Sequence, residues 1–523
     1  MASRLERLPA ELLDLVLNSY ESAPHGDYRN NLSIYHALCL TCKTLREAAT
    51  PYLYKDIRPD RFRDCGLKDV KGHYRKLANT LCARPSLADH VQIFEASASR
   101  SETRQPPSRS EYAAFKRQLK PLIDSGHDQL ALALGRGCFT AEVLVLLSLC
   151  SQVRTLTLPL YDHDSTSDVD KPPVCLYCPD LLSCLSAVDQ SKRPVIAFKK
   201  LTHASVSGRF RPHVPHMAMS PAVASCFLAA PLLTELRCSG LGSFTNAYPW
   251  ICAPATSKVQ SLVMSRSNLA TTDVVQILHS IEALRECEIC WTPLWSSAEG
   301  GTEVKIEHTV DTQALFDALD GHSATLERLV LEEFTGAFED RPAFTSLRHF
   351  HKLRKLTLDE ELLIGNGDWA SESLRDKLPH QLTDLQIHTC FTLENLGDVL
   401  DACGSHVGSD LAVLEIVFPY YEELHEEHPD LFDVNSTSGD RPWFLKAVEG
   451  TQAVFVCEGQ PMGSVLAALA DSIEVNGIDH LLHMQIPHDG GDEGQAVEAG
   501  GASDEEHEDD GADLASGDSA DGH

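Results

Sequence analysis

The sequence predicts an α/β protein in three parts: a small N-terminal helical module, a long array of strands and helices, and an acidic tail. Three observations predict this organisation. Short amphipathic helical patterns fill Leu5 to Ile57, a phrase of the form L-x-x-L-x-L returns throughout the middle of the chain, and residues 490–523 contain no Lys or Arg. Since 523 residues exceed what one compact core holds, we expect the middle to be an elongated array.

The first helix is predicted to open at Leu8-Pro9, because proline suits a first helical position, where no backbone N–H is needed. Two apolar stripes follow, with Leu5, Leu8, Leu12 and Val16 on one and Leu13, Leu17 and Tyr20 on the other. One stripe closes a local core, and the second requires a partner. A second apolar run, from Leu32 to Tyr54, predicts two more short helices and an extended exit.

Four short motifs in this region resemble the F-box in the form common in fungal proteins. They are Leu8-Pro9, Glu11-Leu12-Leu13, Cys42-Lys43-Thr44-Leu45 and Ala49-Thr50-Pro51-Tyr52-Leu53-Tyr54. The resemblance covers residues 1–58 and implies a three-helix module that docks on a Skp-type adaptor and through it on a cullin ubiquitin ligase. The docking residues on this hypothesis are Leu8, Pro9, Leu12, Leu13 and Val16, supported by Leu38 and Leu45. An ordinary amphipathic helical bundle is the alternative interpretation.

The composition limits the classes of partner that the protein is expected to bind and the cellular compartment in which it is expected to lie. The 44 basic and 76 acidic residues give a net charge of −32, which argues against binding nucleic acid or an anionic membrane through a general electrostatic field. Neither a signal peptide nor an apolar run long enough to span a membrane is recognised. The 17 cysteines, an odd number, are typical of reduced thiols. We therefore expect a cytoplasmic or nuclear protein.

Residues 59–150 are expected to form a charged linker and the first helical or repeat units, with a helix at Tyr74 to Leu81 and a strand at Val91 to Phe94. The repeated phrase occupies residues 151–488. Its copies begin at Val153, Leu201, Leu233, Val259, Leu284, Leu326, Leu353, Leu382 and Leu411, with a weaker one at Leu481.

From position 259 to position 411 the copies are 25, 42, 27, 29 and 29 residues apart, and helical patterns fill several intervals. Apart from the long interval, this spacing resembles that of leucine-rich repeats. The expected fold is thus an F-box followed by an irregular leucine-rich-repeat-like solenoid with a disordered acidic tail at 489–523. A non-repetitive α/β domain with parallel strands remains the alternative.

The third and fifth residues of each phrase point away from the core of a strand-based array. Their mixture of charged and small polar groups changes from copy to copy, which is typical of a surface for one protein partner. The residues expected to bind a target protein are Glu235, Arg237, Glu286, Glu288, Arg328, Lys355, Asp384 and Glu415. A face that only contacts solvent is the competing interpretation.

No motif nominates a catalytic nucleophile, a base or a phosphate-binding loop, so we expect neither an enzyme nor a cofactor. Of three C-x-x-C pairs, Cys39/Cys42 and Cys287/Cys290 are interpreted as small buried hydrophobes. Cys175, Cys178, Cys184 and His163 are a zinc candidate whose spacing matches no known finger, so no metal site is predicted. The predicted function is substrate recognition in a cullin-based ubiquitin ligase, and the alternative is an interaction scaffold without a ubiquitin role.

Overall fold

The structure is a computed structural model of the whole chain. It describes residues 8–21, 28–58, 71–96, 106–125, 128–159, 198–208, 219–243, 250–292, 294–297, 303–306, 310–333, 346–359, 362, 377–388, 413–418 and 452–457. The chain divides into two units, Met1–Met484 and Gln485–His523, and all described residues belong to the first. The predicted tail therefore lies outside the described residues.

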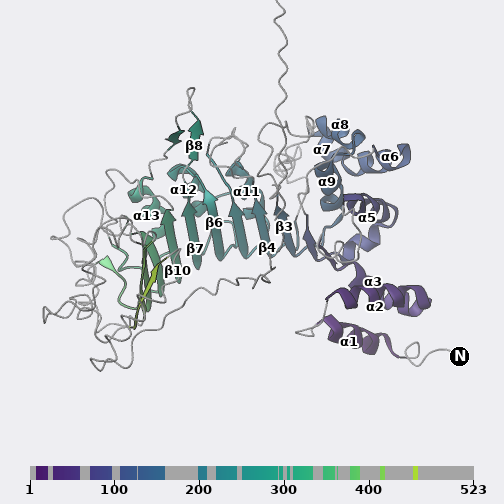
Figure 1. Cartoon of the computed structure of the whole chain (residues 1–523), viewed down its shortest axis with the longest axis horizontal. Coiled ribbons are helices and arrows are strands. Elements are labelled where there is room, and N and C mark those ends of the chain that lie inside the picture. Colours follow the sequence, from purple (N-terminus) through teal and green to yellow (C-terminus); the bar gives the residue numbers. More distant parts are fainter. Residues whose placement is uncertain are drawn as a thin grey trace, which may run out of the picture. The chain divides into compact units, whose positions relative to one another are not determined.

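A twelve-stranded parallel sheet is the main feature of the fold (Figure 1), and its strands lie side by side in chain order. They are β1 (Asp56–Ile57), β2 (Ile93–Glu95), β3 (Thr155–Pro159), β4 (His203–Ser207), β5 (Glu235–Ser239), β6 (Ser261–Ser267), β7 (Glu286–Trp291), β10 (Arg328–Glu333), β11 (Lys355–Asp359), β12 (Asp384–His388), β13 (Val413–Phe418) and β14 (Gln452–Cys457). A separate antiparallel hairpin joins β8 (Leu294–Ser297) to β9 (Glu303–Ile306) between β7 and β10.

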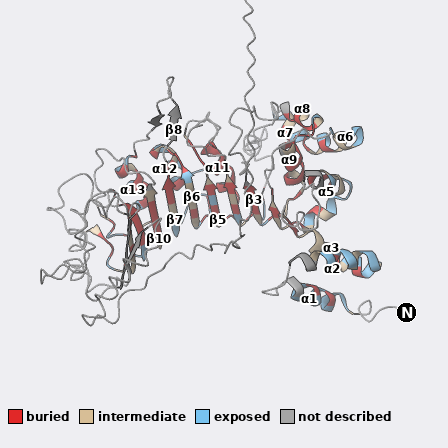
Figure 2. Cartoon of the chain, in the orientation of Figure 1, coloured by how far each residue is buried: buried red, intermediate tan, exposed pale blue. Residues whose placement is uncertain are grey.

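Alternate strand residues build the core. In β6 and β10, Leu262, Met264, Leu329 and Leu331 are fully buried. Of the residues between them, Val263 is partly exposed, whereas Val330 is buried as well. Because the strands pair in register, these buried residues form continuous rows from strand to strand (Figure 2). The parallel register thus gives the sheet one apolar face and one largely polar face.

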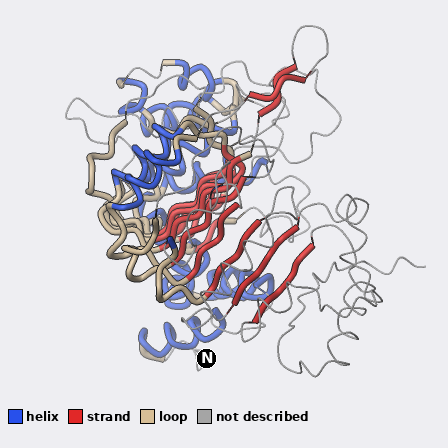
Figure 3. The backbone as a smooth tube through the Cα atoms, turned by 90° about the vertical axis from the view of Figure 1, so that its left-hand side faces the viewer, coloured by secondary structure: helices blue, strands red, loops and turns tan. Residues whose placement is uncertain are grey.

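Helices cover the apolar face, and Figure 3 shows helix and loop segments on one side of the stacked strands. They include α11 (Ala222–Leu228), α12 (Thr271–Ser280) and α13 (Thr312–Asp320), of which α12 and α13 pack on each other. Asp311 caps α13 by accepting a hydrogen bond from the Ala314 amide at 3.0 Å.

A group of helices lies between β1 and β3 in the chain. It contains α5 (Lys71–Ala83), the short 3-10 helix η2 (Pro85–His90), α6 (Arg109–Gln118), α7 (Lys120–Asp124), α8 (Gln129–Gly135) and α9 (Phe139–Leu149). The predicted helix at Tyr74 to Leu81 is part of α5, and the predicted strand at Val91 to Phe94 overlaps β2. Arg75 on α5 and Glu142 on α9 form a largely buried ion pair at 2.6 Å.

Three helices precede the sheet: α1 (Ala10–Glu21), α2 (Tyr28–Thr41) and α3 (Lys43–Tyr54). They share a small core of Leu17, Tyr35 and Ala49. Pro9 precedes α1 and its carbonyl accepts hydrogen bonds from the Leu12 and Leu13 amides, both at 3.0 Å. None of the helices that the structure describes has the length and apolar character needed to cross a membrane.

The expected fold class, an F-box followed by a leucine-rich-repeat-like solenoid, is wrong. The finding that overturns it is a single all-parallel sheet with helices, which is an α/β fold. The repeated phrase identifies a strand with buried alternate residues, but it does not specify what connects that strand to the next. Between β6 and β7 the connection contains α12, whereas between β7 and β10 it contains a hairpin and α13. An α/β domain with parallel strands, kept above as the alternative, describes this sheet.

A buried histidine joins three segments behind the sheet. The Leu284 amide donates to Nδ1 of His322 at 3.4 Å, and Nε2 lies 3.2 Å from the Leu278 carbonyl, so the neutral ring satisfies both groups. Burial lowers the pKa of His322; the hydrogen bond to Leu278 opposes this shift, and the neighbouring His279 adds to it.

The free energy of unfolding should therefore decrease as the pH falls from about 7 to about 5, because the unfolded chain protonates this ring near its ordinary pKa of about 6.5 while the folded chain resists protonation. A His322→Gln variant should show a flatter pH dependence in urea titrations, whereas replacing the exposed His36 should leave the wild-type slope. Equal slopes for wild type and His322→Gln would contradict this role.

Candidate interaction surfaces

An apolar stripe lies exposed on α1. Leu12, Leu15 and Val16 keep 46%, 64% and 38% of their surface exposed. Their spacing of three and four residues places them on one side of the helix. Leu13 and Leu17, on the opposite side, are buried. We call Leu12, Leu15 and Val16 the α1 face.

The hydroxyl of Tyr52 on α3 holds α1 in place by donating to a carboxylate oxygen of Asp14 at 2.5 Å. Tyr35 on α2 donates its hydroxyl to the Leu17 carbonyl at 3.2 Å, and its ring stacks on Tyr52 with centroids 5.4 Å apart. Because these contacts all use the inner side of α1, the α1 face remains available to a partner.

The residues predicted to contact an adaptor fall into two groups. Leu12, Val16 and Pro9 are exposed, and Leu8 and Leu38 are partly buried. Leu13 and Leu45 are buried, so they do not lie on the accessible surface. Leu15, and Leu40 on α2, are exposed apolar residues that the sequence analysis missed. Leu15 lies three residues after Leu12 and so falls outside the stripe of Leu8, Leu12 and Val16, which are four residues apart.

The second surface is the polar face of the sheet, formed by the strand residues that point away from the core. Its first row runs through Thr155, His203, Glu235, Ser261, Glu286, Arg328, Lys355 and Asp384, which pair successively across β3 to β12. Seven of the eight predicted target-binding residues therefore lie on β5 to β12. Five of them are in this first row, and Arg237 and Glu288 are in the next row, two residues further along their strands.

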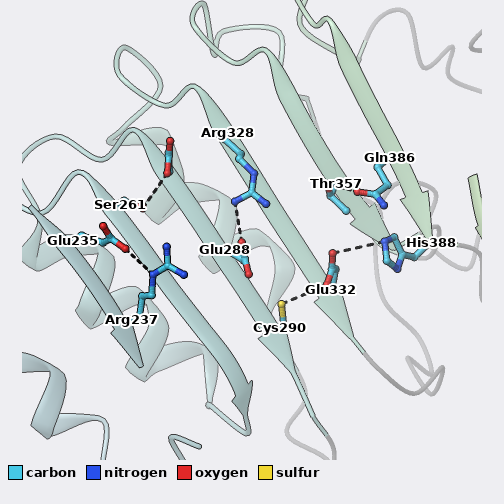
Figure 4. A network of polar contacts seen from close by, with 11 residues as sticks. Glu235, Arg237, Ser261, Glu288, Cys290, Arg328, Glu332, Thr357, Gln386 and His388 are labelled. Atoms are coloured by element: carbon cyan, nitrogen blue, oxygen red, sulfur yellow. Dashed lines mark hydrogen bonds and ion pairs between the residues drawn. The ribbon is translucent and has the colours of Figure 1, made fainter. Parts of the chain in front are cut away.

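Several of these side chains are paired with each other (Figure 4). Glu235 accepts a hydrogen bond from Nε of Arg237 at 2.6 Å. Nε2 of His203 lies 3.7 Å from the other carboxylate oxygen of Glu235. Ser261 donates to Glu286 at 3.0 Å. These contacts hold charged groups in defined positions, which favours recognition of one complementary surface over many.

The pairing continues along the sheet. Arg328 on β10 donates to Glu288 on β7 at 2.8 Å. Lys355 and Asp384 occupy neighbouring positions of the first row on β11 and β12. Glu415 on β13 pairs in register with Gln386 on β12, which places the backbone of Glu415 in the second row.

A further row lies near the carboxyl ends of four strands and was not predicted. Cys290 on β7 pairs with Glu332 on β10. On β11, Asp359 follows Leu358, which pairs with Leu331, and Asp359 itself pairs with His388 on β12. The Cys290 thiol donates to Glu332 Oε2 at 3.4 Å, and His388 Nε2 lies 3.6 Å from Oε1. These residues follow the last leucine of each phrase, a position that the sequence analysis did not consider.

Cys290 does not have the properties of a reactive thiol. Burial raises its pKa, and the charge and hydrogen bond of Glu332 raise the pKa further. The thiol is therefore protonated at neutral pH and acts as a hydrogen-bond donor, because the thiolate is the nucleophilic form.

The structure separates the cysteines of one C-x-x-C pair, since Cys287 is buried in the apolar core whereas Cys290 lies on the polar face. In the other described pair, Cys42 caps α3 by accepting from the Leu45 amide at 3.5 Å. The zinc candidate formed by Cys175, Cys178, Cys184 and His163 lies outside the described residues. Within the part that is described, no group of three or more His, Cys, Asp or Glu side chains is arranged to hold a metal ion.

Comparisons with known proteins assign neither surface. No protein-family model matches the chain, and no curated protein matches its sequence.

Proposed function

We propose that the chain is a substrate-recognition subunit of a cullin-based ubiquitin ligase. Helices α1 to α3 dock on a Skp-type adaptor, the polar face of the sheet binds a target protein, and other subunits transfer the ubiquitin. The observation that carries this proposal is the α1 face, an exposed apolar stripe on a helix whose other side is already packed.

Exposed apolar side chains that gather on one helix mark a site for another protein. Burying a leucine fully is worth about 1.5–3 kcal/mol, so three side chains that are about half exposed supply several kcal/mol to an interface. The motifs that resemble the F-box include Leu12, which supports an adaptor as the partner.

The alternative is an interaction scaffold in which the N-terminal helices only cap the sheet. A cap would cover its apolar residues with the strands and helices that follow. Although α3 packs against η2 and β1, Leu12, Leu15 and Val16 remain exposed. This exposure favours docking on a second protein.

The polar face supports the role in target binding, because its paired charges present a rigid pattern to an incoming chain. This function needs no cofactor and no catalytic group in the chain itself. The described cysteines are free thiols, which supports a location in the reducing cytoplasm or nucleus.

Mixing the full-length chain with a purified Skp-type adaptor tests the proposal. We expect a one-to-one complex by size-exclusion chromatography, with a Kd of about 1 µM or lower by titration calorimetry. Absence of a complex at protein concentrations of about 50 µM, well above that Kd, would refute the proposed function.

A further inference from the structure

The carboxylates of the polar face differ in their partners. Glu235 is held by Arg237 at 2.6 Å and Glu288 by Arg328 at 2.8 Å. Glu332, whose side chain is only 22% exposed, is approached instead by the Cys290 thiol at 3.4 Å and by His388 at 3.6 Å (Figure 4).

Neither group that approaches Glu332 is a strong partner. A thiol is a weak hydrogen-bond donor, and 3.6 Å exceeds the length of an N–H···O hydrogen bond. A carboxylate that has lost most of its water needs charge-assisted hydrogen bonds to recover the lost hydration. Glu332 is therefore a mostly buried anion without an arginine or lysine beside it among the described residues.

The imidazole of His388 also lacks a strong hydrogen-bond partner, which is a separate observation. Its Nε2 atom faces Glu332 and is buried, and it has no hydrogen-bond partner among the residues that the structure describes. Two polar atoms thus face each other at 3.6 Å without a hydrogen bond between them. A group with several N–H donors would satisfy both.

The local charge specifies the sign of the ligand. Asp359 lies beside Glu332 in the same row, and carboxylates on neighbouring strands repel each other. The negative charges of Glu288 and Asp359 also contribute to the raised pKa of Cys290, so several carboxylates act on this one point of the face. A phosphorylated or acidic segment would be repelled here, whereas a cation would be attracted.

We infer that Glu332 and His388 form the binding site for a basic side chain, an arginine or a lysine, of an extended segment in the target protein. This inference rests on the proposed role of the polar face in target binding. Arginine fits best, because its planar guanidinium donates two parallel hydrogen bonds to one carboxylate and retains further N–H groups for an imidazole nitrogen. Cys290 on β7 and His388 on β12 border the site on its two sides.

Selection of random 12-residue peptides on the full-length chain by phage display tests the inference. We expect enrichment of arginine or lysine at one peptide position. Glu332→Gln keeps the shape of the side chain but removes its charge, and it should weaken binding of the selected peptides about 10- to 100-fold, the usual loss for a hydrogen bond to a charged group. Glu282→Gln is the matched control, because that carboxylate lies outside the polar face in an exposed ion pair with Lys258, and its affinities should stay within about twofold.

A change in the peptide gives the same test without altering the protein. Replacing the enriched arginine by its neutral isostere citrulline should weaken binding of the peptide to the wild-type chain. The same replacement should leave the already weakened binding to Glu332→Gln unchanged. The inference is overturned if no peptide is enriched, if the enriched peptides lack a basic position, or if Glu332→Gln binds them as wild type does. Adaptor binding by α1 to α3 is measured separately, so either proposal can fail without the other.

Discussion

Replacing Leu12 and Val16 together by aspartate should weaken adaptor binding at least about a hundredfold, which corresponds to about 2.8 kcal/mol. Each substitution removes apolar surface from the α1 face, and each places a carboxylate that must lose water when the interface closes. The Kd measured by titration calorimetry with the full-length chain and a purified Skp-type adaptor checks this expectation.

The matched control is Leu232→Asp, because Leu232 is 47% exposed and precedes β5, far along the chain from α1. This variant should bind the adaptor as wild type does. Both variants should unfold at the wild-type temperature, since the altered residues are exposed and Leu13 and Leu17 still pack α1. Wild-type affinity of the Leu12, Val16 double variant would show that the α1 face does not contact the adaptor.

Replacing Glu142 by leucine should lower the free energy of unfolding by about 3–5 kcal/mol. Glu142 on α9 has a side chain that is 2% exposed, and it accepts a hydrogen bond from Nε of Arg75 on α5 at 2.6 Å. Removing the carboxylate takes away the charge that lies 2.6 Å from a largely buried guanidinium, so less of the cost of desolvating that guanidinium is offset. Urea denaturation followed by circular dichroism measures the change.

Two variants separate loss of the charge pair from loss of packing. Glu282→Gln disrupts the exposed ion pair with Lys258 and should cost less than about 1 kcal/mol, because solvent screens such pairs. A double variant, Arg75→Met with Glu142→Leu, should recover much of the lost stability, since the buried guanidinium is removed together with the carboxylate. If Glu142→Leu were as mild as Glu282→Gln, the buried pair would not stabilise the packing of α5 on α9.

The repeated phrase predicted the strands closely because its information is local. Each of the nine complete copies coincides with a strand that begins at the third residue of the phrase, as in Leu284 with β7 and Leu326 with β10. The first residue of the phrase packs into the core just before the strand starts, and Leu284 and Leu326 are fully buried. The hairpin β8–β9 and the strand β14 have no such phrase and were not predicted.

The candidate surfaces were predicted less completely. The outward positions of the polar face follow from the two-residue period of a strand, so Glu235, Arg237, Glu288 and Arg328 could be nominated from the sequence. The pairing of these side chains could not be predicted from the sequence, because Glu288 and Arg328 are 40 residues apart and meet only through the register of β7 and β10. The burial of Leu13 and Leu45 likewise depends on how α1 and α3 pack, and the pattern of leucines alone does not specify it.

The sequence by itself determined where the strands lie, which of their residues enter the core, and that α1 carries more apolar surface than one side of a helix can bury. These properties depend on residues that are neighbours in the chain. Only the tertiary structure decided that the strands form one parallel sheet, which leucines of α1 stay exposed, and that Cys290, Glu332 and His388 meet near the carboxyl ends of their strands. The physical reason is that strand register and helix packing join segments separated by tens of residues, and a local pattern carries no information about such distant pairs.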